Sequence, residues 1–455
     1  MDFLTFPNNT ACLLDNYSDN SPVAVRLEGP VSVNKFIHDI RQLASTLPQA
    51  QHVMNLCEDR YAFMVGFAAA MLCRQVTLMP HTIAPETLAQ IIKGYEGVYC
   101  LADDVKTQVE VETRFVETAG SGEDSLENTP SFPLSQPAVI TFTSGSTGNP
   151  ASHEKSWGSL VKGAILAVRR FNLGSGSAYS GVATVPQQHM YGFETSIMTP
   201  LRSGGAFYTR RAFFPEDIHR AFKSLSPPRV LVTTPFHLRA MVKEGPSLPE
   251  IELIISATAP LSSNLALQVE NTFNSKVYEI FGCTEAGSIA SRRTVETDVW
   301  KTYEGINIFE TGDGFEVSGG HIDFPTVVPD TLELGSESEF TLLGRNQDMV
   351  NIAGKRASLS DLNIKLNEID GVEDGIFYIP EENSEDGRVK RLKAFAVAPR
   401  MNENDIINML AKVMDRVFLP RPLFLVDKLP RNGTGKVARA RLLQMAKDMT
   451  NDEAT

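Results

Sequence analysis

The alternation of two hydrophobic patterns constrains the fold of this chain more than any other feature of its sequence. From about residue 30 to residue 300, stretches with helical periodicity alternate with short apolar runs rich in β-branched residues. These runs include AVITFT, RVLVTT, IELIIS and KVYEIF, which begin at residues 138, 229, 251 and 276. Short strands that alternate with helices are typical of β-α units. The sequence therefore predicts an α/β fold with mainly parallel sheets for this region.

The pattern changes after about residue 345. Two apolar runs, GIFYIP and RLKAFAVAP, flank the polar segment EENSEDGR, which is typical of a hairpin. An apolar helical face follows, formed by Ile406, Met409, Leu410, Val413, Met414 and Val417. We therefore expect a large N-terminal domain of mixed sheets and helices over residues 1–345, and a small, mobile α+β domain over residues 346–455.

Charge and cysteine content exclude several classes of protein. A net charge of −13 argues against a general surface for nucleic acid or anionic membranes. The cysteines are odd in number and form no C-x-x-C pair, which favours reduced thiols. The longest apolar run, Tyr61 to Cys73, is too short to span a bilayer and predicts a buried helix. The N-terminus lacks the pattern of a secretory signal, so we expect a cytoplasmic protein without stable membrane insertion.

One loop is unusually rich in small hydrogen-bond donors. The stretch TFTSGSTGNPASHEKSW, residues 141–157, places glycines and hydroxyl residues directly after the first strand run. Glycine lets backbone N–H groups approach an anion closely, and Ser and Thr add donors without bulk, so this loop predicts a phosphate site. It is not the common P-loop, because Gly148 is followed by Asn149 and Pro150. In isolation, a flexible Ser/Gly linker is the alternative.

Further motifs follow this loop in a definite order. They are QQHMYGF, SATAPL, VYEIFGCTEAG, LLGRNQDMVNIAGKR and LPRNGTGKVAR, which begin at residues 187, 256, 277, 342 and 429. With these motifs the chain resembles the adenylate-forming superfamily, which contains acyl-CoA synthetases, aryl-CoA ligases, peptide-synthetase adenylation domains and luciferases. The resemblance covers roughly residues 135–440.

The resemblance implies an AMP-forming acid:thiol ligase. Such an enzyme uses ATP and Mg²⁺ to join a carboxylate to the α-phosphate, and it releases pyrophosphate. The acyl group then passes to a phosphopantetheine thiol of coenzyme A or of an acyl carrier protein. A carboxyl group is already ionised at neutral pH, so adenylation needs no general base and depends on positioning and charge neutralisation. The expected partners are a small carboxylic acid and one of these thiol acceptors.

The resemblance also assigns roles to residues of the large domain. Those expected at the β- and γ-phosphates are Thr143, Ser144, Gly145, Ser146, Thr147 and Gly148. Those expected around adenine and the acyl pocket are Ala257, Thr258, Ala259 and Phe281. Thr284 occupies a phosphate-contacting position and Glu285 the magnesium-binding position. A Thr-Glu pair by itself is commonly a helix cap, whereas Mg²⁺ on a triphosphate takes one or two protein carboxylates.

Two aspartates compete for the ribose of the nucleotide. The family's ribose-binding Asp usually lies in Thr-Gly-Asp, and that tripeptide occurs here at residues 311–313. The runs on either side of Asp313 alternate like two strands around a turn, which explains Asp313 as part of a hairpin. In the family the ribose-binding Asp precedes the ribose-binding Arg by about a strand, a turn and another strand, and the segment from Asp330 to Arg345 matches that arrangement, although Pro329 replaces the usual glycine. We therefore predict that Asp330 and Arg345 bind the ribose.

The remaining candidates lie in the small domain and in the QQHMYGF segment. Lys436 matches the lysine that bridges the substrate carboxylate and the α-phosphate, and Gly354 matches the glycine that lines the pantetheine path. His189 occupies the position where the family often has an aromatic or histidine gate between acyl pocket and thiol tunnel, although a single histidine near an apolar segment is commonly structural. Tyr191 and Phe193 are candidates for the lining of an aryl pocket, although aromatic residues after a strand are commonly core.

The chain departs from the family pattern at two positions. Ala151 replaces the lysine that usually follows the phosphate loop, and the nearest lysine is Lys155. Gln347 occupies the hinge position that usually holds Asp or Lys. The HEKSW sequence and the short large domain resemble the compact ligases of aryl-polyene pathways, which favours an aryl or hydroxyaryl acid. A medium-chain acid, or a catalytically silent nucleotide- or carrier-protein-binding member, remains an alternative.

Overall fold

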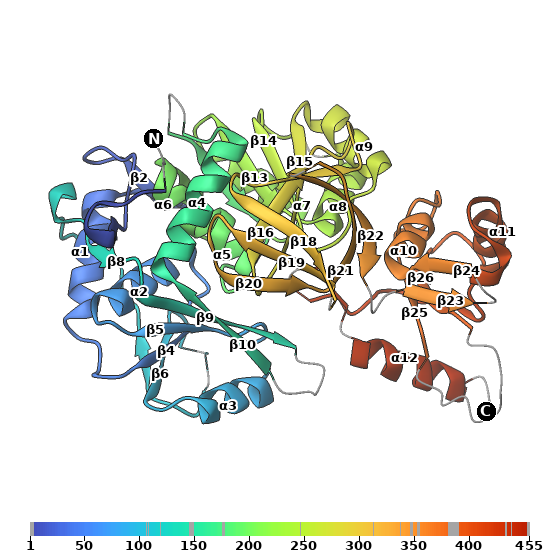
Figure 1. Ribbon diagram of the computed structural model, residues 1–455, viewed down its shortest axis with the longest axis horizontal. Coiled ribbons are helices and arrows are strands. Elements are labelled where there is room, and N and C mark those ends of the chain that lie inside the picture. Colours follow the sequence, from blue (N-terminus) through green and yellow to red (C-terminus); the bar gives the residue numbers. More distant parts are fainter. Residues whose placement is uncertain are drawn as a thin grey trace.

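The structure is a computed structural model of the chain. It describes residues 4–105, 107, 109–118, 120–144, 150–174, 178–245, 247–312, 314–336, 338–345, 349–352, 355–380, 391–432, 435–437 and 439–452. Figure 1 shows a large body, coloured blue to yellow, and a smaller orange-to-red body beside it.

The largest sheet among the described residues has eleven strands. Its centre is parallel and runs in the order β15 (Lys276–Cys283), β14 (Leu253–Ser256), β13 (Arg229–Thr233), β11 (Ser180–Ala183), β12 (Ala206–Tyr208) and β2 (Pro22–Arg26). Antiparallel strands flank it: β3 (Gly29–Ser32) on one side, and β16 (Gly287–Arg292), β17 (Val299–Thr302), β22 (Glu339–Arg345) and β21 (Asp330–Leu334) on the other. The predicted α/β fold with a mainly parallel core is confirmed.

A second, six-stranded sheet carries the hydroxyl-rich loop. Its order is β10 (Pro150–Ser156), β9 (Pro137–Ser144), β5 (Val76–Met79), β4 (His52–Asn55), β6 (Val98–Ala102) and β7 (Thr113–Phe115). All neighbours are parallel except β9 and β10, which form an antiparallel hairpin. The predicted phosphate loop follows β9 in the sequence, and its residues 145–149 lie outside the described part of the chain.

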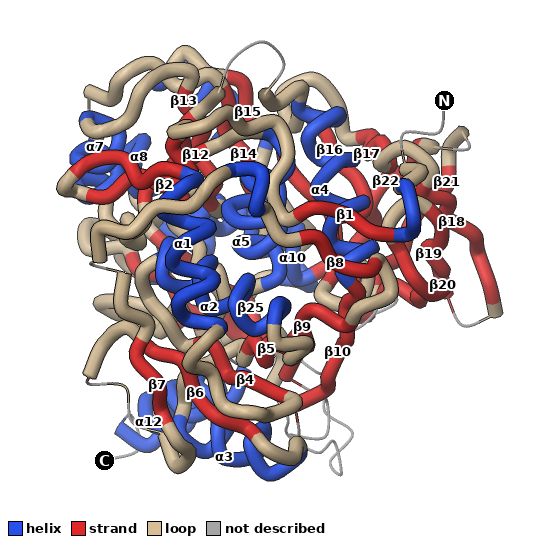
Figure 2. Tube along the Cα trace, turned by 90° about the vertical axis from the view of Figure 1, so that its left-hand side faces the viewer, coloured by secondary structure: helices blue, strands red, loops and turns tan. Residues whose placement is uncertain are grey.

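Helices fill the space between the two sheets. Figures 1 and 2 both place α2 (Arg60–Leu72) and α5 (Met190–Phe193) between the parallel strands of the large sheet and those of the smaller one. Helix α2 is apolar on every side and buried along most of its length, as a helix covered on all faces must be. The sequence predicted this buried helix correctly. In the described part of the chain, every helix falls short of the length or hydrophobicity that crossing a bilayer requires.

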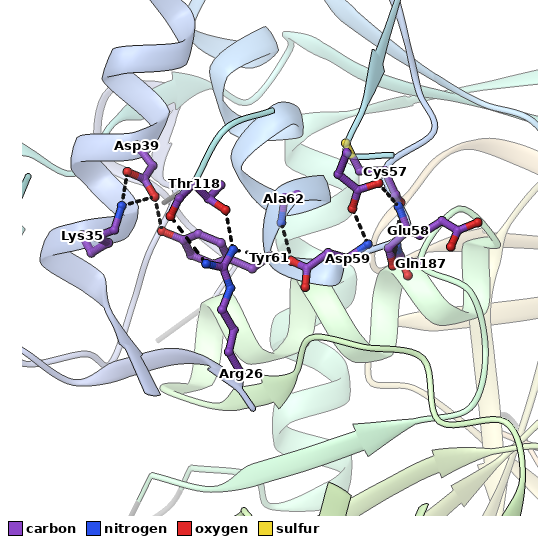
Figure 3. Close-up of polar contacts among 11 residues, drawn as sticks. Arg26, Lys35, Asp39, Cys57, Glu58, Asp59, Tyr61, Ala62, Thr118 and Gln187 are labelled. Carbon is purple, nitrogen blue, oxygen red and sulfur yellow. Dashed lines mark hydrogen bonds and ion pairs between the residues drawn. The ribbon is translucent and has the colours of Figure 1, made fainter. Parts of the chain in front are cut away.

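A buried polar network joins α2 to α1 (Val33–Ala44). The Asp39 carboxylate accepts hydrogen bonds from Lys35 Nζ (2.5 and 2.7 Å) and from the Tyr61 hydroxyl (2.8 Å), as Figure 3 shows. The Arg26 guanidinium lies 4.7 Å from the centre of the Tyr61 ring and donates to Thr118 Oγ1 at 2.5 Å. Because a buried carboxylate without partners is costly, these contacts offset the cost of burying Asp39 between the two helices.

The other elements of the large body surround these sheets. The remaining helices are α3 (Pro85–Gly94), α4 (Trp157–Phe171), a π-helical turn (Glu194–Met198), α6 (Thr199–Ser203), α7 (Pro215–Lys223), α8 (Pro235–Glu244) and α9 (Ser263–Phe273). The remaining strands are the pair β1 (Thr10–Cys12) and β8 (Ser131–Pro133), and the sheet of β18 (Ile306–Thr311), β19 (Gly314–Gly319) and β20 (Ile322–Val328). Strands β18 and β19 form the hairpin predicted around Asp313, which itself lies outside the described residues.

The smaller body has its own core. Its strands are β23 (Met349–Ile352) with β24 (Lys355–Ser358), and the sheet of β25 (Asp374–Tyr378), β26 (Lys393–Val397) and β27 (Leu423–Leu425). Its helices are α10 (Leu359–Asn367), α11 (Glu403–Val413) and α12 (Arg439–Asp452). Two hydrophobic clusters contain only residues after 349, whereas the other clusters end by residue 342. This separation supports the proposed boundary near residue 345.

Helix α11 is shorter than its apolar pattern implied. It ends at Val413, so Met414 and Val417 lie beyond it. Met414 is extended, and the Asp415 carboxylate then accepts a hydrogen bond from the Val417 amide at 3.2 Å, which starts a new 3₁₀ turn. The apolar residues continue into the core of the small body, but on a different element.

Candidate active site

Several of the predicted site residues of the large body lie where parallel strands end. Tyr191, on α5, donates a hydrogen bond to the carbonyl of Thr233 (3.1 Å) and to that of Ile255 (2.9 Å). These carbonyls lie at the carboxyl ends of β13 and β14, the edge at which α/β sheets usually bind ligands. Helix α5 therefore crosses these strand ends. Burial raises the pKa of Tyr191, so its hydroxyl stays protonated.

The segment before α5 is fixed by a buried amide. Gln187 Nε2 donates to the carbonyls of Cys57 (2.8 Å) and Glu58 (3.0 Å), at the start of α2 (Figure 3). Two residues later, His189 Nδ1 is buried without a hydrogen-bond partner among the described residues. Burial, with a contribution from the charge of Lys436, lowers the pKa of His189 to about 3. The imidazole is therefore neutral at physiological pH.

The two aromatic pocket candidates lie in different surroundings. Tyr191 belongs to the cluster around the strand ends of the large sheet. Phe193 is fully buried on the opposite side of α5, where its ring lies 6.1 Å from that of Phe63 and 5.2 Å from that of Phe67. The structure therefore places Tyr191 with the strand ends and Phe193 with the core around α2.

The predicted adenine wall follows β14. Ala257 is buried, and Thr258 has a φ of +78°, which is uncommon for a residue with a branched side chain. Phe281, near the end of β15, is buried and lies 5.7 Å from the Trp300 ring and 5.4 Å from the Phe340 ring. An aromatic cluster therefore holds Phe281 at the strand end beside this wall.

Thr284 and Glu285 lie in the turn between β15 and β16. The Glu285 carboxylate is one-third exposed, and its Oε1 lies 3.4 Å from His153 Nε2 on β10. His153 Nε2 also lies 3.2 Å from the hydroxyl of Thr143 on β9. This places the phosphate-loop hairpin beside the Thr-Glu turn. Sequence reasoning missed His153, although it stands two residues after Ala151 and so shares its strand face.

The arrangement fits a magnesium ion carried by a nucleotide. In the described part of the chain, His, Cys, Asp and Glu side chains form no group of three or more that could hold a metal by itself. Mg²⁺ is commonly held by one or two protein carboxylates plus substrate phosphates. The accessible carboxylate of Glu285 is therefore sufficient as the protein ligand.

The two predicted ribose ligands are direct neighbours. Asp330 opens β21 and Arg345 closes β22, and the antiparallel register pairs these two residues. Asp330 is 5% exposed. The predicted strand-turn-strand arrangement is confirmed, whereas the ribose role of both residues stays a prediction.

Lys436 lies in a small hairpin that faces the large body. Arg431 and Val437 form an antiparallel bridge, and the Lys436 amide donates to Asn432 Oδ1 at 2.9 Å. A Cβ on Gly435, whose φ is +79°, would lie 3.0 Å from the Cβ of Phe236 on α8. A cavity of about 120 Å³ lies between the two bodies, lined in part by Thr258, Ala259, Phe236, Arg239, Asn363 and Arg431. The structure thus brings the Lys436 hairpin to the ends of β13 and β14, where Thr258 and Ala259 of the predicted adenine wall lie.

Some predicted positions fall outside what the structure describes. Ser144 ends β9, but its side chain is not described. Outside the described residues lie Gly145, Ser146, Thr147, Gly148, Gln347 and Gly354. Their roles stay predictions.

Comparisons with known proteins identify the family of this chain. A family model described as "AMP-binding enzyme" matches residues 32–309. The 4-coumarate–CoA ligase of Halorhodospira halophila is 26% identical over 308 residues, which cover 66% of this chain and 74% of the relative. The 2-succinylbenzoate–CoA ligase of Geobacillus sp. (strain WCH70) is 23% identical over 466 residues, covering 90% of this chain and 91% of the relative.

A solved structure extends the likeness to the whole fold. ATP-bound MatB from Rhodopseudomonas palustris superposes with a TM-score of 0.78 at 18% identity, covering 95% of this chain and 97% of that one. The family model alone spans more than half of the chain. The chain therefore belongs to the AMP-binding enzyme family.

Proposed function

We propose that this protein is an AMP-forming acid:thiol ligase that activates a small carboxylic acid with ATP and transfers the acyl group to a phosphopantetheine thiol. The observation that carries the proposal is the position of the Lys436 hairpin. It lies against Phe236 on α8 and beside Thr234, the residue that follows β13. A lysine delivered to this edge by a second domain suits the joining of two anions, a carboxylate and an α-phosphate.

The two half-reactions need different groups. In the first, a carboxylate oxygen attacks the α-phosphorus and pyrophosphate leaves, while Lys436 and Thr284 offset the negative charge that develops. A magnesium ion held by Glu285 and the phosphates would neutralise the leaving pyrophosphate. In the second, the thiol sulfur attacks the acyl carbon and AMP leaves. For this step we propose that His189, which is neutral, lines the passage between thiol and acyl group.

We infer an aryl or hydroxyaryl acid as the substrate class. The relatives described above are named for 4-coumarate and 2-succinylbenzoate, both of which contain an aromatic ring. Tyr191 offers an aromatic wall at the strand ends. A medium-chain acid is the competing substrate class, and coenzyme A or an acyl carrier protein would supply the thiol.

A catalytically silent nucleotide- or carrier-protein-binding protein is the competing function. Ala151 in place of the family lysine and Gln347 at the hinge favour it. Acid-dependent exchange of labelled pyrophosphate into ATP distinguishes the two, with a panel of benzoates, cinnamates and medium-chain acids. A ligase exchanges label with a particular acid, whereas exchange with no acid would refute the proposed function. The active acid, offered with coenzyme A and with a pantetheinylated carrier protein in turn, then identifies the acceptor.

A further inference from the structure

The turn that carries Thr284 and Glu285 is held by side chains from three distant segments. Lys155 Nζ, on β10, donates a hydrogen bond to the Glu285 carbonyl. His321 Nε2 donates to the next carbonyl, that of Ala286, at 2.9 Å. Glu194, in the π-helical turn, accepts hydrogen bonds from the amide (3.3 Å) and the hydroxyl (2.7 Å) of Ser288. The carbonyls of Glu285 and Ala286, and the amide and hydroxyl of Ser288, are therefore all bound by side chains to which the family resemblance assigned no role.

The turn fits tightly against these groups. Gly287 has a φ of +81°, and a Cβ there would overlap Glu194 Oε1 and lie 3.1 Å from His321 Nε2. Lys155 is 6% exposed and His321 is 3% exposed. Burial lowers the pKa of His321 to about 4, so the ring is neutral and donates through Nε2. The turn cannot shift without breaking buried hydrogen bonds.

Lys155 is the only lysine or arginine among the three side chains described above that hold the turn, the others being Glu194 and His321. Burial lowers its pKa, and the charge of Glu194 is the main influence that opposes this shift, followed by Cys283, Asp323 and Glu285. Among the described residues, its hydrogen-bond partner is the Glu285 carbonyl. Lys155 Nζ therefore holds the backbone of the residue expected to bind magnesium, and Glu194 holds the Ser288 end of the same segment.

The position of Lys155 bears on the family lysine that Ala151 replaces in this chain. Ala151, where the family usually has lysine, is exposed. Residues 151, 153 and 155 share one face of β10, because side chains alternate along a strand. On this face His153 reaches the Glu285 carboxylate and Lys155 reaches its carbonyl. Strand β10 therefore carries its lysine where it contacts the Thr284–Glu285 turn, whereas the family usually has a lysine directly after the phosphate loop.

We propose that Lys155 is a positioning residue, which holds the Thr284–Glu285 turn in the geometry that binds the magnesium–nucleotide complex. This inference rests on the proposed function for its catalytic meaning, but the turn geometry can be tested without any acid. A charge-assisted hydrogen bond to the carbonyl of a ligand-bearing residue limits the movement of its carboxylate. Its loss lets the turn relax away from the phosphate hairpin.

The first test compares Lys155→Met with Glu154→Gln, a matched control at the neighbouring exposed position on β10. ATP binding is measured by calorimetry over a magnesium titration, with AMP as a ligand that needs no metal. We expect Lys155→Met to weaken magnesium-dependent ATP binding by about ten- to a hundredfold, with AMP binding unchanged and the control like wild type. A folded Lys155→Met protein with the wild-type magnesium dependence would overturn the proposal.

A second variant covers the case in which Lys155→Met does not fold. Lys155→Met/Glu194→Gln removes both charges, so it avoids leaving an uncompensated buried carboxylate. We expect this double variant to melt at a higher temperature than Lys155→Met and still to bind ATP weakly at limiting magnesium. Wild-type ATP binding by the double variant would refute the positioning role. Because neither measurement needs an acid, failure of the acid panel and failure of this inference give different results.

Discussion

At the scale of single residues, the proposed chemistry depends most on Lys436. Lys436→Ala should lower acid-dependent pyrophosphate exchange by about a hundredfold or more, because one point cation offsets the charge of two anions. Thioester formation from pre-made acyl-adenylate should be largely spared, since no phosphate bond forms in that step. Lys428→Ala, at an exposed lysine of the same region, is the control. An equal loss in both half-reactions would assign Lys436 a structural role instead.

The pairing of Asp330 with Arg345 leads to a second prediction at this scale. Asp330→Ala should raise the apparent KM for ATP by about ten- to a hundredfold, since a carboxylate that accepts ribose hydrogen bonds contributes about 1.5–3 kcal/mol. Asp313→Ala, at the Thr-Gly-Asp tripeptide, should leave this KM unchanged. ATP titrations of the two variants decide between them. The reverse result would move the ribose site to Asp313.

At the scale of elements, the lysine hairpin is held by an ion pair within the small domain. Arg431 Nε and Nη2 donate to the Asp374 carboxylate at 2.7 and 2.6 Å, and Nη1 donates to the Gly435 carbonyl at 2.6 Å. The same guanidinium lies 5.8 Å from the centre of the Phe236 ring on α8. Arg431 thus links β25, the residue before Lys436 and the large domain.

This linkage predicts that Asp374→Asn slows adenylation without weakening ATP binding. Loss of the bidentate pair should lower the exchange rate about tenfold, equivalent to about 1.4 kcal/mol, while the KM for ATP stays unchanged. The control is Glu373→Gln, which breaks an interdomain ion pair to Lys243 between side chains that are 41% and 61% exposed. Exposed pairs contribute about 0–1 kcal/mol, so this variant should resemble wild type. Equal losses in both variants would contradict the hairpin's dependence on Arg431.

At the scale of the whole molecule, buried histidines make stability depend on pH. Burial lowers the pKa of His237 to about 3 and that of His321 to about 4, and both rings are nearly inaccessible. The unfolded chain titrates its histidines near pH 6.5, so between pH 4 and 6.5 it binds more protons than the folded chain. Each histidine therefore contributes stability that is fully present above about pH 6.5 and is lost as the pH falls through this window.

The expected result is a melting temperature that falls more steeply with acid in wild type than in His321→Gln. Each histidine should account for up to about 1.4 kcal/mol per pH unit below 6.5. Burial raises the pKa values of Glu194 and Glu279, which act in the opposite direction, so the difference between the two melting curves isolates the histidine. Glutamine keeps a donor for the Ala286 carbonyl. Parallel curves for the two proteins would refute the assignment.

Local patterns in the sequence determined most elements and the order of the motifs. The apolar run that became α2 and the β-branched runs that became β9, β13, β14 and β15 each depend on residues close together in the chain. The strand, turn and strand expected between Asp330 and Arg345 are also present, and the structure adds that the two residues pair across them. Periodicity depends only on neighbouring residues, so the helix and strands predicted from it were confirmed.

Only the tertiary structure decided which side chains surround the Thr284–Glu285 turn. Lys155, Glu194 and His321 come from separate segments. The sequence marked Lys155 only as the lysine nearest to Ala151 and gave no sign of its contact with the Glu285 carbonyl. The apolar pattern after Ile406 did not reveal that α11 ends at Val413. The apolar residues continue without a break from α11 into the next element, and both elements pack on the same core. Hydrogen bonds between distant segments form only when the chain folds back on itself. Their partners are therefore set by how the sheets and helices pack, and not by neighbouring residues.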